Sequence, residues 1–194
     1  GRNFSRHFQE TMIQGNWNSS AESIDFVFRD TYKNLLSKWE DKYKFPLINS
    51  LNHAQSEIPD KINLLQDNDY FALSPLLQQI GLMFYDSLNK AELYKNILNP
   101  TEEEKKGASI AYLHRLFEHL KIDDTEFNTF LKNERTLRSI LSLAHHNGAK
   151  ITKDNEKRSL AYVGLSIENL NTKEAAKNLL TKGSEAMQKI IEQL

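Results

Sequence analysis

Four short polar motifs in this chain have the composition of helix N-termini, and they constrain the fold more than any other feature. In each motif a Ser or Thr comes first. It is followed directly by Pro, by Lys and an acidic residue, or by a Glu three residues later. They are Ser74-Pro75, Thr101 with Glu104, Thr152-Lys153-Asp154 and Thr172-Lys173-Glu174. A Ser or Thr side chain at an N-cap accepts a hydrogen bond from a free backbone N–H, and proline suits the first helical turn because its missing N–H has no partner there. Each motif therefore predicts the start of a helix.

The spacing of apolar residues extends this prediction to the rest of the chain. Apolar residues recur three and four apart within segments bounded by proline, glycine or polar turns. The segments cover residues 4–12, 20–43, 46–57, 75–98, 101–120, 125–147, 154–170 and 173–194. Alternating β-branched runs and hairpin dipeptides are missing. We predict an all-α fold of seven to eight helices, arranged as an antiparallel multi-helix bundle or as stacked helical hairpins.

Length and composition bound the domain count and the location. The 194 residues suffice for a single helical domain over 1–194, with a soft division near 58–73, where the periodicity is weakest. The chain has no cysteine and no apolar run long enough to cross a bilayer, so we expect no membrane span. We expect the protein to be located in the cytoplasm. A secreted or periplasmic location stays open because the chain begins with Gly1 rather than Met, which is compatible with removal of an upstream signal peptide or domain.

Several kinds of chemistry lack their residues in this sequence. Without cysteine there are no thiolate zinc sites and no cysteine nucleophile. The seven glycines are too far apart to build a phosphate-binding loop, and the G-x-S-x-G, H-E-x-x-H and Glu-x-x-His patterns do not occur. Net charge is −1, which argues against a global field for nucleic acid. We therefore expect no cofactor and no resident metal, and a protein that is more easily explained as a binding module than as an enzyme.

Aromatic residues gather near the N-terminal end and suggest a surface for a partner. Nine of the 19 aromatic residues lie within the first 45 positions. Phe26, Tyr32 and Trp39 are the candidates for contact with a protein partner or with a second copy of the chain, because aromatic side chains are enriched at interfaces. A helix buried on two sides at the centre of the bundle explains the same pattern. This surface supports the leading hypothesis of a non-enzymatic helical module that binds a protein partner or self-associates.

A locally basic segment over residues 132–158 supports a second hypothesis. Its principal members are Arg135, Arg138, His145, His146 and Lys150. Arg138 and His145 are two helical turns apart and so share one helix face. Arginine holds phosphate bidentately and histidine transfers protons near pH 7. Such a pair could cleave RNA without a metal by activating the 2′-hydroxyl.

Arg138-Ser-Ile-Leu-Ser-Leu-Ala-His145 is similar to the R-x(4–6)-H motif of HEPN domains. The resemblance covers eight residues. It implies a helical bundle that acts as a metal-independent ribonuclease, as a dimer, with Arg138 and His145 as catalytic residues and RNA as the partner. HEPN enzymes usually carry Asn, Asp or His directly after the arginine, where this chain has Ser139.

A third hypothesis is a small-molecule sensor with an apolar pocket between helices. The three hypotheses make different structural predictions. The binding module requires exposed aromatic area on the N-terminal helices, and the ribonuclease requires Arg138 and His145 in one accessible cleft. The sensor requires an enclosed cavity of several hundred cubic ångströms.

Overall fold

The computed structural model describes residues 23–51, 55–68, 70–96, 109–147, 153–166 and 168–194, with backbone alone at 70, 71 and 142–147. In these ranges it contains eight helices, and its only extended pairing is one isolated bridge. The helices are α2 (Ile24–Tyr43), α3 (Ile58–Lys61), α4 (Tyr70–Met83), α5 (Lys90–Asn96), α7 (Ser109–Leu120), α8 (Thr125–Asn147), α9 (Asp154–Tyr162) and α10 (Thr172–Ile191). The predicted all-α helical bundle is confirmed. The helix expected at 4–12 and the motif at Thr101 lie outside the described residues.

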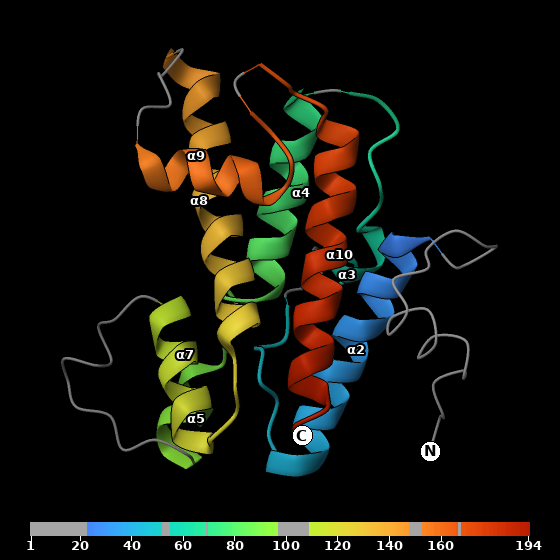
Figure 1. The fold of residues 1–194 in the computed structure, drawn as a ribbon. Helices are drawn as coiled ribbons and strands as arrows, with labels where there is room; N and C mark the ends of the chain where they lie inside the picture. The colour runs from blue at the N-terminus through green and yellow to red at the C-terminus, as the bar shows by residue number, and fades with distance from the viewer. Residues whose placement is uncertain (1–22, 52–54, 69, 97–108, 148–152, 167) are drawn as a thin grey trace.

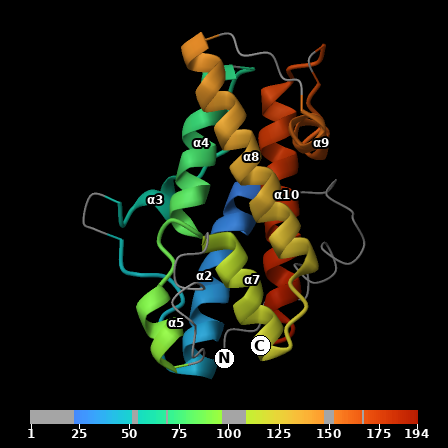
Figure 2. The same ribbon diagram turned by 90° about the vertical axis from the view of Figure 1, so that its left-hand side faces the viewer.

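The long helices α8 and α10 run along the bundle, with α2 packed against α10 and α4 packed mainly against α8 (Figures 1 and 2). The helix α9 lies across α8, and α5 and α7 lie toward the end of the bundle that holds the C-terminus (Figures 1 and 2). A single cluster of buried apolar side chains connects these helices. Because the long helices each bury one or two faces against neighbours, most of their apolar residues face this cluster.

The helices α2 and α10 run in the same direction. Gly183 of α10 lies against Phe28 near the start of α2, and Gln193 accepts a hydrogen bond through its backbone oxygen from Lys42 near the end of α2. By contrast, α8 runs antiparallel to α10, because Glu126 at its start pairs with Lys189 near the end of α10. Short connections favour antiparallel neighbours only for helices that follow each other in sequence. The first and last described helices are free of that constraint.

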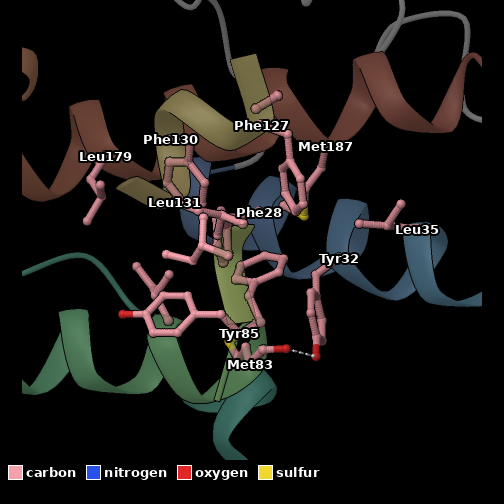
Figure 3. Close-up of a cluster of buried hydrophobic side chains, with 14 of the residues drawn as sticks. Phe28, Tyr32, Leu35, Met83, Tyr85, Phe127, Phe130, Leu131, Leu179 and Met187 are labelled. Atoms are coloured by element: carbon pink, nitrogen blue, oxygen red, sulfur yellow. Dashed lines mark hydrogen bonds between the residues drawn. The ribbon is translucent and has the colours of Figure 1, made fainter. Parts of the chain in front are cut away.

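Aromatic rings fill the centre of the bundle (Figure 3). The ring of Phe84 packs edge-to-face on four others, with centroid distances from 5.2 to 6.3 Å; these rings belong to Phe28, Tyr32, Phe127 and Phe130. Edge-to-face pairs place the positive ring edge on the negative ring face, which adds to the free energy gained by burial. The centre of the molecule is therefore held by contacts between α2, α8 and the end of α4.

Two predicted helices, 46–57 and 75–98, are wrong in part for a single physical reason. Leu47–Asn49 and Ser87–Asn89 pair as short extended segments, with the Asn49 amide donating to Ser87 and the Asn89 amide donating to Leu47. This pairing buries Leu47, Ile48 and Leu88 in the core. Residues 46–51 are consequently not helical, and the second helix is divided into α4 and α5.

The helix starts predicted at Ser74 and Thr172 are each displaced. The helix α4 begins at Tyr70, so Pro75 lies inside it and removes one backbone hydrogen bond of the second turn. At α10 the N-cap is Asn171, whose side chain accepts from the Glu174 amide at 3.1 Å. Asparagine caps as well as threonine does, because both offer a side-chain oxygen to the free N–H groups.

The helix α9 ends eight residues earlier than the predicted 154–170. Gly164 has φ of +79°, the Leu165 amide donates to Leu160, and the Gly164 amide donates to Ala161. These two hydrogen bonds and the left-handed residue define a Schellman motif, which stops a helix and strongly favours glycine. A glycine inside a periodic segment was the sequence signal for this earlier end.

Candidate functional site

The aromatic residues proposed for partner contact divide between core and surface. Tyr32 is 3% exposed and donates its hydroxyl to the Met83 carbonyl at 2.8 Å (Figure 3). Trp39 is fully buried against Phe117 and other rings. The prediction that these two lie on the surface is therefore wrong, because α2 is buried on two sides, against α10 and against the end of α4. Of the three candidates, only Phe26 is exposed, at 55%, and so available to a partner.

Phe26 is covered in part by a cation. The Arg29 guanidinium lies 4.2 Å from the centre of the Phe26 ring, and it also donates to the Asp60 carbonyl at 2.7 Å. Arg29 thereby connects the start of α2 to α3. One exposed ring that already interacts with its neighbour is ordinary for a protein surface and does not define a docking site.

The described members of the basic segment do not form one cluster. Arg135 is exposed on α8, whereas Arg138, one turn later, contacts residues that follow α4. His145 and His146 lie on α8 where only the backbone is described, and Lys150 lies outside the described residues. The shared cleft that the ribonuclease hypothesis requires for Arg138 and His145 stays a prediction.

Arg138 makes two contacts that fix its guanidinium group. Its Nη1 atom donates to Asp86 Oδ2 at 2.7 Å, and the guanidinium lies 4.9 Å from the centre of the Tyr85 ring. Burial lowers the pKa of Arg138 and the bond to Asp86 raises it, with a net rise. A phosphate bound by Arg138 would have to compete with Asp86 for this group.

Other basic residues of the segment converge on an open groove between α7, α8 and α9. The groove has a volume of about 530 Å³. Its lining consists of Ile110, Ala111, Lys132, Arg135, Thr136, Ser139, Ile140, Lys153, Asn155 and Glu156. Lys132, Arg135, Thr136 and Ser139 are spaced three, four and seven apart on α8, and this spacing places them along one stripe of the helix. The groove is open to solvent, unlike the enclosed pocket that the sensor hypothesis requires.

One side-chain hydrogen bond helps to hold α9 beside α8 and so helps to form the groove. The Ser159 hydroxyl donates to Asn133 Oδ1 at 2.9 Å, and Ser159 is buried. The first turn of α9 is closed by Glu156, whose side chain accepts from the Lys153 amide at 3.3 Å. Because Glu156 sits at the positive end of the helix dipole, its charge is partly compensated there.

The groove has an excess of positive charge. Within the described lining, Lys132, Arg135 and Lys153 contribute three cations and Glu156 the one carboxylate. Lys153 Nζ lies 4.0 Å from Glu156 Oε1, whereas Lys132 and Arg135 form no ion pair within the described ranges. Sequence reasoning singled out Arg138, as the partner of His145, and counted Arg135 only as a member of the basic segment. The spacing of Arg135 from Lys132 and Ser139, three and four residues, was the available signal for its place on the groove stripe.

His114 of α7 contacts two carboxylates. His114 Nδ1 lies 2.9 Å from Oδ1 of the buried Asp124, and Nε2 lies 3.6 Å from Glu118 Oε1. The Asp124 contact joins α7 to the segment that leads into α8. Over the described part of the chain, no three His, Cys, Asp or Glu side chains are placed to hold a metal ion.

Comparison with protein-family models, with curated proteins and with solved structures finds no match to this chain. Among the described helices, none combines the length and the apolar character needed to cross a membrane. The described residues form an all-α helical bundle whose groove between α7, α8 and α9 gathers positive charge.

Proposed function

We propose that this chain is a non-enzymatic binding module whose basic groove holds an acidic segment of a protein partner. The observation that supports the proposal is the convergence of Lys132, Arg135 and Lys153 on one open groove of about 530 Å³. Glu156, the only carboxylate among the described lining residues, is engaged with the start of α9. Two of the three cations have no ion pair among described residues, so an acidic ligand would not have to displace an internal partner.

The composition of the lining favours a protein ligand over single-stranded nucleic acid. Proteins that bind single strands combine a basic groove with aromatic side chains on which bases stack. The described lining contains no aromatic residue and instead has an apolar floor that includes Ile110 and Ile140. Apolar and cationic groups together match a segment that alternates acidic and apolar side chains, and complementary charge would guide its register.

The open shape favours a segment of a macromolecule over a small molecule. Small-molecule sites usually enclose most of the ligand surface. This groove is open to solvent along α8, and the spacing of Lys132, Thr136 and Ser139 places them on one stripe of that helix. A segment laid along α8 would contact the stripe over successive turns.

The proposal predicts saturable binding of a labelled poly-glutamate peptide, measured by fluorescence anisotropy at low salt. Replacing Lys132 and Arg135 together by Ala should weaken this binding about tenfold, because two of the three groove cations are lost, and added salt should reduce the difference. The matched control replaces Arg158 and Lys177 by Ala. Both residues are exposed and neither lines the groove, so binding should change less than twofold.

Three outcomes would contradict the proposal. Equal weakening by the groove and control variants would show that binding follows total charge. Tight binding of poly-uridine RNA with no binding of poly-glutamate would favour a nucleic-acid ligand. Cleavage of that RNA without metal, lost in Arg138→Ala and His145→Ala, would establish the ribonuclease. If the chain binds itself instead, sedimentation will show a concentration-dependent increase in mass that the groove variant abolishes.

A further inference from the structure

A buried carboxyl group lies at the contact between α8 and the end of α4. Glu134 is fully buried, and its Oε2 atom accepts a hydrogen bond from the Tyr85 hydroxyl at 2.7 Å. Its other oxygen, Oε1, has no hydrogen-bond partner among described residues. An ionised carboxylate has about four acceptor sites, and an unpaired buried charge costs far more free energy than a neutral acid does. The geometry therefore favours the protonated form of Glu134.

An ion pair lies on the solvent side of this carboxyl group. Arg138, one turn after Glu134 on α8, crosses Gly81 of α4 to reach Asp86. A Cβ atom at Gly81 would lie 2.5 Å from Arg138 Nη1 and 2.8 Å from the Tyr85 hydroxyl, so the absence of a side chain makes this route available. Arg138 thus holds the end of α4 against α8 through Asp86 and the Tyr85 ring.

The described titratable groups that act on the pKa of Glu134 are Tyr85, Asp86 and Arg138. Burial raises this pKa to about 8, while the Tyr85 hydrogen bond and the charge of Arg138 lower it and the charge of Asp86 raises it. Burial and the neighbouring Glu134 raise the pKa of Tyr85, which therefore remains the hydrogen-bond donor. The proton that is exchanged near neutral pH belongs to Glu134.

We infer that Tyr85, Asp86, Glu134 and Arg138 form a proton-sensitive latch between α4 and α8. With a proton on Glu134, Arg138 is held by Asp86 at the surface. When the proton is lost, the buried carboxylate attracts Arg138 inward, and the end of α4 loses its ion pair with α8. This inference is independent of the groove, which lies on a different stripe of α8.

The sign of the pH dependence follows from the two protonation states. The ordinary glutamate pKa is 4.5, so above that value the unfolded chain loses this proton while the folded chain keeps it up to about pH 8. The folded state therefore binds one more proton in this window, and the unfolding equilibrium constant should rise up to tenfold per pH unit. The stabilising effect is complete below pH 4.5 and is lost as pH rises through 8.

The test compares the chain with Glu134→Gln, which keeps the shape and the acceptor for Tyr85 but does not titrate. The ratio of wild-type to variant unfolding constants should rise steeply from about pH 5 to pH 8 and be flat below pH 4.5. Asp86→Asn is the second variant: it removes a charge that raises the Glu134 pKa and frees Arg138 to pair with Glu134, so the steep rise should remain but end at a lower pH. A ratio that is flat across this range would overturn the inference.

Two measurements on the wild-type chain test the latch even where a variant folds poorly. Carbon-13 NMR of the Glu134 carboxyl should show a titration near pH 8, and a titration near 4.5 would contradict the inference. Hydrogen exchange at the amides of Phe84 and Asp86, which donate to Ile80 and Gly81, should accelerate above pH 8 beyond the intrinsic rate. Unchanged protection of these amides with a titrating Glu134 would show a buried acid without a latch.

Discussion

Arg135 and Arg138 illustrate how two identical side chains, one turn apart, acquire different roles. Both belong to the same basic segment of the sequence, yet Arg138 reaches an aspartate that is 52 residues earlier in the chain and Arg135 faces the groove. Periodicity predicts which stripe of α8 each residue occupies, but it does not predict which helix covers that stripe. Sequence reasoning therefore found the segment and not the site within it.

Gly183 packs closely against two aromatic rings of the core. A Cβ atom there would lie 2.7 Å from the Phe28 ring and 2.8 Å from the Phe130 ring. Alanine ordinarily stabilises a helix by ~1 kcal/mol relative to glycine. At this position we expect Gly183→Ala to destabilise the protein by about 1–3 kcal/mol, because two packed rings have to move.

Urea unfolding measures this effect, with Lys177→Ala on the exposed face of the same helix as the control. The control should change the free energy of unfolding by less than about 0.5 kcal/mol. An increase in stability for Gly183→Ala would mean that the aromatic rings move aside easily, and that close packing between α2, α8 and α10 is not required.

Local sequence signals predicted a helix end correctly where residues next to that end determine it. The ends of α2 and α8 are close to those expected, since Tyr43 is followed by the left-handed Lys44 and Asn147 precedes a glycine. The segments 46–57 and 75–98 were misassigned because Leu47–Asn49 and Ser87–Asn89 bond to each other across a long stretch of chain. Helical periodicity within either segment carries no information about the other.

Asn89 stabilises this non-local pairing and also the start of α5. Its side chain donates to the Pro46 carbonyl at 2.9 Å and accepts from the Glu92 amide at 3.4 Å, and the residue is buried. We expect Asn89→Ala to destabilise the protein by about 1–3 kcal/mol, because it removes two hydrogen bonds made by a buried side chain. Thermal unfolding measures the loss.

Asn96→Ala on the same helix provides the matched control. Asn96 is exposed, and among the described residues it hydrogen-bonds only within α5, to Glu92. We expect a change below about 0.5 kcal/mol. If both asparagine variants are equally mild, the contact between residues 46–49 and 87–89 contributes little to the stability of the fold.

The groove and the latch lie on different faces of α8. One face forms the groove with α7 and α9, and another closes on the end of α4 through Glu134 and Arg138. The all-α class was predictable from the helix-start motifs and the spacing of apolar residues, since these are properties of single helices. Long-range packing determines that α2 and α10 run parallel and that α7, α8 and α9 form a groove. Helix-start motifs and apolar spacing carry no information about such packing.

The central claim is that the groove between α7, α8 and α9 is the binding site, and chemical-shift mapping tests it most directly. Poly-glutamate would be titrated into the nitrogen-15-labelled chain while backbone amide signals are followed. We predict saturable shifts concentrated at Ile110, Ala111, residues 132–140 and Lys153–Glu156, with small changes elsewhere. Shifts spread over exposed lysines of α2 and α10, or none that saturate, would contradict the claim.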